Sequence, residues 1–243
     1  MNIKDATVLV TGANRGIGLA FVKELLAGGA RKVYAGVRDP DAATALAGLD
    51  LSRVEVMALD VTKPDAIAAA TAHCDDVALL VNNAGIARFA GLIGGGDAAR
   101  DEMETNYFGT LNMIRAFAPV LKENGGGAVV TLGSIASHVN FPVLGSYSAS
   151  KAAVHSLIQG VRAELADQGT LVVGVYPGPI DTEMAEPFPM EKTAPDVMVR
   201  TVLDALEAGE EDVYPDAKSV ELHAGLQADP KAVEKEVGTM LPQ

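Results

Sequence analysis

Cysteine is nearly absent from this sequence, since Cys74 is the single one among 243 residues. No intramolecular disulfide is therefore possible, and the composition suits a reducing compartment. The four histidines and this cysteine do not have the spacing of metal ligands, so we expect no metal site.

Basic residues are also few, and long apolar runs are missing. The chain has 19 Lys and Arg against 32 Asp and Glu, which gives a formal net charge of −13. This charge disfavours nucleic acid and anionic membrane surfaces as partners. No run is long enough to span a bilayer, and the first residues lead into an apolar strand without the pattern of a signal peptide. We expect a soluble, cytoplasmic protein.

Apolar residues make up 49% of the chain, which is typical of a folded protein with a core. The length suits one α/β domain. No internal repeat, low-complexity linker or shift in composition marks a boundary. We therefore expect residues 1–243 to form a single domain.

Short β-branched runs alternate with longer Ala- and Leu-rich stretches along the chain. The pattern predicts strands at 8–11, 32–37, 54–59, 77–81, 128–132, 171–176 and 212–214, and helices at 16–27, 42–49, 65–73, 97–122, 148–168 and 193–208, with a helical tail. Strands such as Val8–Val10 and Val77–Val81 are apolar throughout, which indicates burial on both faces. We expect a doubly wound α/β fold of the Rossmann type, with a parallel sheet of about seven strands and helices on both faces.

The first strand leads into a glycine-rich turn that opens the first helix. Glycine lets the backbone approach a phosphate closely, and the amides and dipole of a helix N-terminus favour its negative charge. A tight turn without a ligand is the simpler reading, but three glycines at the first βα turn favour nucleotide binding. The spacing is GxxxGxG rather than GxGxxG. The candidate residues are Gly12, Asn14, Arg15, Gly16, Ile17 and Gly18.

The end of the second strand bears on the choice of cofactor. An acid there binds the ribose 2′-hydroxyl of NAD, but Val37 occupies that position and Arg38 follows it. Arg38 and Arg15 can both bind a 2′-phosphate, so NADP (as NADPH) is the expected cofactor. Two alternatives stay open. In the first, Arg38 is a solvated charge that binds no phosphate. In the second, Asp39 binds the 2′-hydroxyl of NAD instead of capping the next turn.

Three polar residues in the second half can act together on one carbonyl group. Tyr147 and Lys151 are four apart and share a face of the predicted helix, while Ser134 follows the fifth strand. A nearby ammonium favours the phenolate, so we expect Lys151 to lower the pKa of Tyr147. The YxxxK spacing alone is a weak pattern.

Taken in order, these motifs resemble the short-chain dehydrogenase/reductases. The resemblance covers about residues 5–182. It rests on the glycine turn, Leu59-Asp60-Val61, Asn82-Asn83-Ala84-Gly85, Asn106, Ser134, Tyr147 with Lys151, and Pro177-Gly-Pro-Ile-Asp-Thr182. It implies that residues 1–125 bind the cofactor and that residues 126–243 carry the catalytic and substrate-binding groups.

The resemblance also assigns individual roles. The remaining cofactor contacts would come from Asp60, Val61, Asn82, Asn83, Gly85, Tyr147, Lys151, Pro177, Ile180 and Thr182. Hydride would pass between nicotinamide and a carbonyl or alcohol carbon. Ser134 would orient the substrate oxygen, Tyr147 would exchange a proton with it, and Lys151 would hold the ribose. Asn106, which read alone is a surface residue of an amphipathic helix, would distort that helix and hold a water near Lys151.

The sequence indicates the residues that contact the substrate less clearly than those that contact the cofactor. By position, residues 184–190 should cover the substrate, and their Met and Phe side chains favour an apolar ketone or aldehyde. Arg88 is the nearest candidate cation for an anionic substrate, or is simply solvated. The candidate pocket residues are Ile86, Phe89, Val139, Phe141, Leu144, Met184 and Phe188, with His138 at the edge.

Two other functions compete with a carbonyl reductase that also oxidises secondary alcohols. One is a 3-oxoacyl-thioester reductase, although the net charge disfavours docking of an acidic carrier protein. The other is a non-catalytic NADP-binding sensor, which has no need of Ser134, Tyr147 and Lys151. The charged tail after residue 216 puts the tetramer common in the family in doubt. A homodimer through the helices of Asn106 and Tyr147 and a monomer are the two states that stay open.

Overall fold

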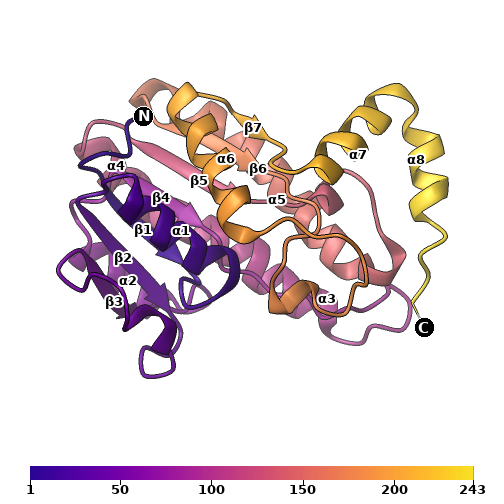
Figure 1. The fold of residues 1–243 in the computed structure, drawn as a ribbon, viewed down its shortest axis with the longest axis horizontal. Helices are drawn as coiled ribbons and strands as arrows, with labels where there is room; N and C mark the ends of the chain where they lie inside the picture. Colours follow the sequence, from indigo (N-terminus) through magenta and orange to yellow (C-terminus); the bar gives the residue numbers. More distant parts are fainter. Residues whose placement is uncertain (243) are drawn as a thin grey trace.

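The computed structural model describes residues 1–242, and its centre is one parallel sheet (Figure 1). Seven strands lie in the order β3-β2-β1-β4-β5-β6-β7. Their bounds are β1 (Thr7–Thr11), β2 (Lys32–Val37), β3 (Val54–Ala58), β4 (Leu79–Asn82), β5 (Ala128–Leu132), β6 (Leu171–Val175) and β7 (Asp212–Val213). The direction of winding reverses between β1 and β4, so the predicted doubly wound Rossmann-type fold is confirmed.

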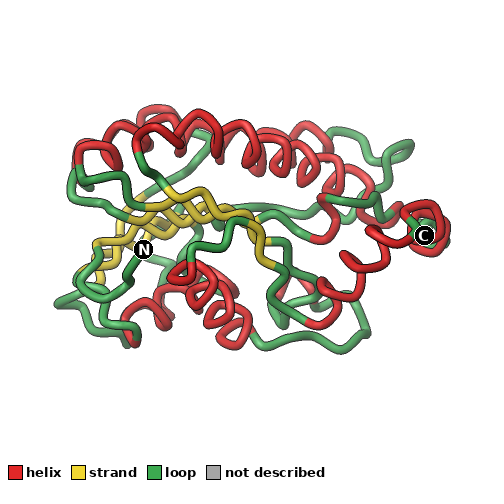
Figure 2. Tube along the Cα trace, turned by 90° about the horizontal axis from the view of Figure 1, so that it is seen from above, coloured by secondary structure: helices red, strands yellow, loops and turns green. Residues whose placement is uncertain are grey.

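Helices cover both faces of this sheet (Figure 2). On one face lie α1 (Gly16–Ala27) and α6 (Pro195–Ala208), and on the other α2 (Pro64–His73), α4 (Thr110–Glu123) and α5 (Gly145–Leu165). Each face has its own core, with Phe21 and Met198 buried in the first and Phe117 and Ile158 in the second. Strand residues alternate between the two cores, which explains why the strands are apolar throughout.

The prediction of a helix over residues 42–49 is wrong. The segment contains a single 3-10 turn at Thr44–Leu46. Pro40 and Gly48 bound the segment, and the few residues between them cannot offset the cost of nucleating a helix. Leu46 instead anchors the loop in the core.

The single helix predicted over 97–122 consists of three segments. These are α3 (Ala98–Glu102), a π-helix (Met103–Gly109) and α4. A π segment accommodates an extra residue within a helix and is common near functional sites. Asn106 lies inside it, in agreement with the interpretation of this residue as one that distorts the helix.

Helix α5 begins at Gly145, three residues before its predicted start, so Tyr147 lies in its first turn. The other short 3-10 turns span Ile135–Ser137, Pro142–Leu144, Ala166–Gln168 and Glu183–Ala185. The helical tail forms α7 (Ala217–Ala228) and α8 (Pro230–Val237). After α8 the chain returns to the body, where the Val143 amide donates to the Met240 carbonyl oxygen at 2.8 Å. Within residues 1–242, no helix is both long and apolar enough to cross a membrane.

Candidate active site

Many of the predicted site residues lie where four neighbouring parallel strands end. The glycine turn follows β1, Asn83 follows β4, Ser134 follows β5 and Pro177 follows β6. Since the carboxyl ends of parallel strands share one edge, the fold gathers these residues where the winding reverses. Ligands of doubly wound proteins bind at this edge.

The glycine turn is shaped to receive a phosphate. Gly12 has a φ of +66°, a left-handed conformation that disfavours side chains. A Cβ on Gly18 would lie 2.1 Å from the Gly12 carbonyl oxygen, so only glycine fits there. Helix α1 begins without a side-chain cap, which leaves its first amides available to an anion. These features fit a dinucleotide.

Asn83 joins the glycine turn to the end of β4. Its side-chain amide donates to the carbonyl oxygens of Thr11 at 2.9 Å and Gly12 at 3.1 Å. The Thr11 hydroxyl accepts from the amides of Asn83 and Ala84. Asn83 thus holds the turn in place.

The neighbouring Asn82 carries an unsatisfied polar group. Its side chain is buried, and its Oδ1 has no hydrogen-bond partner among the described residues. An unpaired buried acceptor is costly and rare in folded proteins. It fits a site that receives a further polar group.

After β3, Asp60 stabilises a turn and Val61 packs in the core. The Asp60 carboxylate accepts from the Thr62 amide at 2.9 Å and from its hydroxyl at 2.7 Å. The Val61 side chain is buried in the core on the α4 face. The residues predicted to contact adenine are therefore fixed in place.

The charged residues that follow β2 and those of the glycine turn have different contacts. The Asp39 carboxylate accepts from the amides of Asp41 and Ala42, so it caps the next turn as expected. Arg38 is exposed beside it. Arg15 lies across from the segment after β6, where it forms an ion pair with Glu183.

Lys151, a candidate catalytic residue, is buried in the protein. It is 6% exposed, and its Nζ donates to the Leu132 carbonyl oxygen at 2.6 Å. The same Nζ lies 5.7 Å from the centre of the Tyr147 ring. Burial lowers the pKa of Lys151 to about 8.

The pKa of Tyr147 differs from the sequence expectation. Burial raises it to about 12, the interaction with the Ser134 hydroxyl lowers it, and the charge of Glu102 raises it. Desolvation of the phenol is the largest cause, and Lys151 is not among the groups that shift this pKa in the protein by itself. Tyr147 is therefore a neutral phenol near pH 7.

Ser134 is held by the turn that follows it. It caps the 3-10 turn at Ile135–Ser137, and its Oγ accepts from the Ala136 amide at 3.1 Å. Its own amide donates to the Ser137 hydroxyl. The Ser134 hydroxyl therefore reaches Tyr147 from a fixed position.

Asn106 binds the segment after β4 rather than facing solvent. Its Oδ1 accepts from the Ile86 amide at 2.8 Å, and its Nδ2 donates to the Ile86 carbonyl and to the Ser150 hydroxyl, each at 2.9 Å. The sequence reading missed Ser150 and the buried Glu102. Glu102 stands four residues before Asn106, a helical spacing that could have identified it.

On the substrate side, the structure joins two of the predicted pocket residues. The rings of Phe89 and Phe188 lie 5.7 Å apart, while Met184 is largely exposed. The Phe141 amide donates to the Ser148 hydroxyl, and Leu144 lies in the 3-10 turn that contacts the tail.

Two polar candidates on this side are engaged elsewhere. Arg88 is exposed and pairs with Asp101 at 3.0 Å. His138 packs against aromatic residues of α5 and the tail, with its Nε2 3.3 Å from the Tyr214 hydroxyl. The contacts of the Arg88 guanidinium and of the His138 ring are therefore with residues other than Ser134.

The segment after β6 approaches the glycine turn. A Cβ on Gly16 would lie 3.2 Å from the Thr182 methyl group, and the Arg15–Glu183 ion pair connects the same two segments. Ile180 is buried and forms a bridge with Thr193. The Pro177 carbonyl accepts from the Ile135 amide at 3.0 Å.

Comparison with known proteins adds close structural relatives. A short-chain dehydrogenase from Burkholderia cenocepacia, solved in complex with NADP, shares 44% identity with a TM-score of 0.92. The match covers 98% of this chain and 99% of that one. An enzyme of the same type from Sphingobium yanoikuyae, in complex with NADPH, has 27% identity, a TM-score of 0.80 and 95% coverage of both chains.

Curated relatives have different names. Galactitol 2-dehydrogenase (L-tagatose-forming) from Cereibacter sphaeroides is 38% identical over 191 residues, 75% of this chain and 74% of that protein. The mouse dehydrogenase/reductase SDR family member 7B is 34% identical over 196 residues, and the match spans 75% of this chain but only 60% of that protein. The family model for short chain dehydrogenase matches residues 6–193. The chain belongs to the short-chain dehydrogenase/reductase family of oxidoreductases.

Proposed function

We propose that this protein is an NADPH-dependent carbonyl reductase that also oxidises secondary alcohols. The observation that carries the proposal is the meeting of Ser134, Tyr147 and Lys151 at the carboxyl edge of the sheet, beside the glycine turn. In this reading residues 1–125 serve mainly the cofactor, and residues 126–243 the chemistry.

The cofactor would lie along the edge of the sheet. Its pyrophosphate would meet the amides at the start of α1, and Arg38 would meet the 2′-phosphate. Asn82 offers its unpaired Oδ1 to a polar group of the ligand. NADP and NADPH complexes of two structural relatives support this choice. When bound, the cofactor supplies or accepts a hydride.

Side chains of the protein would transfer the proton to and from the substrate oxygen. Ser134 would hold the substrate oxygen by a hydrogen bond, and Tyr147 would donate its phenolic proton to that oxygen during reduction. Because the pKa of Tyr147 is raised to about 12, the donor is fully protonated at neutral pH. Lys151 would restore the proton from its ammonium, whose pKa of about 8 suits transfer near neutrality.

An apolar ketone or aldehyde is the proposed substrate class. Phe89 and Phe188 pack on one another, and Met184 and Met190 are exposed on the segment that follows β6. Burying an apolar substrate group against such side chains would favour binding, because apolar surface is removed from water. The relative named as a galactitol dehydrogenase makes polyols and ketoses the necessary comparison.

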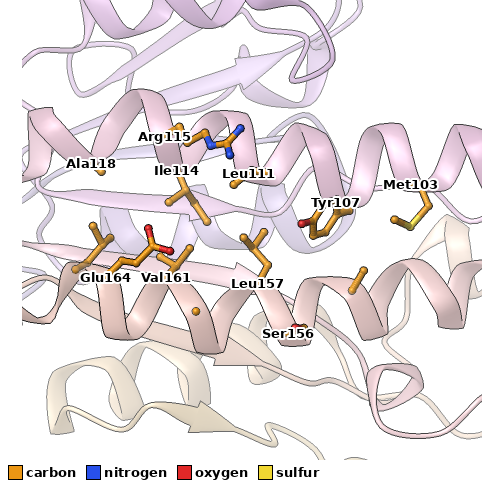
Figure 3. Close-up of a pocket in the computed structure, with 13 residues that line it drawn as sticks. Met103, Tyr107, Leu111, Ile114, Arg115, Ala118, Ser156, Leu157, Val161 and Glu164 are labelled. Atoms are coloured by element: carbon orange, nitrogen blue, oxygen red, sulfur yellow. The ribbon is translucent and has the colours of Figure 1, made fainter.

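We also propose a homodimer, with the pair of helices α4 and α5 as its interface. A groove of about 540 Å³ runs between these helices (Figure 3). Leu111 and Ile114 enter it from one helix, and Leu157 and Val161 from the other. Helices of a second copy would cover this apolar floor.

The deciding experiment follows NADPH oxidation in the presence of ketones, aldehydes, ketoses and 3-oxoacyl thioesters. We expect activity on apolar ketones and none on thioesters. The Tyr147→Phe variant should lose reduction by at least about 100-fold while keeping its affinity for NADPH. Unchanged activity in that variant would rule out the proposed chemistry and favour the non-catalytic sensor.

A further inference from the structure

Glu102 is a buried carboxyl group to which the proposed chemistry gives no part. It is 0% exposed, at the end of α3. One carboxylate oxygen accepts from the Arg88 amide at 2.6 Å, and the other has no hydrogen-bond partner among the described residues. Burying a carboxyl with an unpaired oxygen costs free energy. Its presence here therefore calls for a role beyond packing.

Glu102 and Asn106 together hold one stretch of chain. Asn106 binds the amide and carbonyl of Ile86, and Glu102 binds the amide of Arg88, two residues further on. Both acceptors come from successive turns of the helical region that packs on α5. The segment from residue 86 to residue 88 is thus attached to the same helix that carries Asn106.

Phe89, the next residue, is held in an unusual conformation. Its φ is +53°, in the left-handed region that bulky side chains avoid. Such a residue persists only where its surroundings enforce it. The bond from Glu102 to the preceding amide supplies that constraint. The result is the contact of the Phe89 ring with Phe188, at 5.7 Å between centres and 55° between planes.

We propose that Glu102 is a positioning residue for the substrate wall, fixing the Arg88 amide and thereby holding the Phe89 ring against Phe188. The proposal rests on the proposed carbonyl reductase function. The Arg88 guanidinium does not neutralise this carboxyl, since it turns outward to Asp101. The backbone amide is thus the group that the carboxylate holds.

The test compares Glu102→Leu with Glu102→Gln in the full-length protein. Gln keeps an oxygen acceptor for the Arg88 amide, whereas Leu removes it. We expect Glu102→Leu to raise KM for an aromatic ketone about tenfold, the size of one lost charge-assisted hydrogen bond, with kcat reduced less. Glu102→Gln should stay within about threefold of the unaltered protein. The affinity for NADPH, measured by fluorescence, should not change in either variant.

A second variant keeps the proposal open to refutation if Glu102→Leu folds poorly. Phe89→Ala removes the ring directly and should raise the same KM. The double variant should then be no worse than Phe89→Ala alone, because both changes act through one wall. Additive losses, or an unchanged KM in Glu102→Leu, would overturn the role of Glu102. Absence of any ketone-dependent NADPH oxidation by the unaltered protein would instead overturn the proposed function, and this inference with it.

Discussion

Lys151, for which we propose a catalytic role, also carries a cost to stability. Its ammonium is buried, and its Nζ bonds to the Leu132 carbonyl oxygen. Because the folded protein lowers the pKa from 10.5 to about 8, the unfolded chain binds the proton more tightly between these two values. Stability from this group therefore rises with pH through that window, and the full cost of the buried charge is present below pH 8.

Lys151→Met should make the protein inactive and yet more stable. At pH 7 we expect the free energy of unfolding to rise on the order of 1–2 kcal/mol, the charge penalty less the lost bond to Leu132. The gain should shrink as pH rises toward 10.5. Urea unfolding at pH 7 and pH 10 measures both effects. A destabilised variant at pH 7 would contradict the prediction.

Arg38 should decide between the two nicotinamide cofactors. Arg38→Asp removes the exposed guanidinium at the end of β2 and places an acid near the 2′ position. The KM for NADPH should rise about tenfold to 100-fold, and that for NADH should change little. Steady-state kinetics with both cofactors checks this. Lys23→Asp, at an exposed position of α1, is a control for the charge change alone. Equal effects of Arg38→Asp on the two cofactors would contradict the assignment.

Candidate residues can be named from the sequence where a motif spans only a few positions. The glycine turn and the pair Tyr147 and Lys151 are identifiable because each motif lies within one turn or one helix. The pKa of Tyr147 was misjudged, since burial depends on the whole fold. The carbonyl of Leu132 as partner of Lys151 was invisible, because every residue has a carbonyl oxygen and only the fold selects this one.

At the scale of elements, the tail helix α7 is attached through a cluster of aromatic rings. His138 lies 4.6 Å from the rings of His155 and Tyr176, and Tyr214 stacks on His223 at 4.0 Å. Asp212 and Arg162 are the charged neighbours of the cluster. Burial, together with the charges of His155 and His223, lowers the pKa of His138 to about 4.

Acid should therefore weaken the attachment of α7. The unfolded chain takes up a proton on His138 near pH 6.5, whereas the folded protein resists until about pH 4, so stability falls as pH drops through this window. The loss should be on the order of 2 kcal/mol. His138→Phe should flatten this part of the stability profile, measured by thermal unfolding from pH 7 to pH 4.5. An unaltered slope in His138→Phe would contradict the argument.

Element boundaries were harder to predict than element types. The helical period continues through residues 98–123, so the period by itself gives no sign of the π turn at Met103–Gly109, and only the family resemblance indicated a distortion at Asn106. It follows from bonds between Asn106 and a distant segment. Composition also misled at residues 42–49, where Ala and Leu indicate a helix but the loop is too short to form one.

At the scale of the whole molecule, the groove between α4 and α5 should be covered in a dimer. Leu111→Glu places a charge on the apolar floor and should shift the protein to a monomer, raising the dissociation constant at least about tenfold. Light scattering after size-exclusion chromatography measures the mass. Val220→Glu, on exposed α7, is the matched control. A monomeric mass for the unaltered protein would contradict the homodimer.

The sheet was predictable at this scale because its rules are simple. Alternating strands and helices require parallel pairing, and right-handed connections then set the strand order around β1 and β4. The path of the tail was not predictable, since α7 and α8 carry no motif and their placement depends on side-chain packing.

The return of the tail to the body has a practical meaning for biosensor design. The Val143 amide donates to Met240, and Pro242 lies against Gly91, so the tail touches loops that neighbour the candidate substrate residues. The first residues lie at the other end of the sheet, where the Ile3 amide donates to Glu207 of α6 (Figure 1). An electrode or bead coupled through the amino terminus would leave the proposed substrate side open to analyte, whereas coupling through the carboxyl terminus would crowd it.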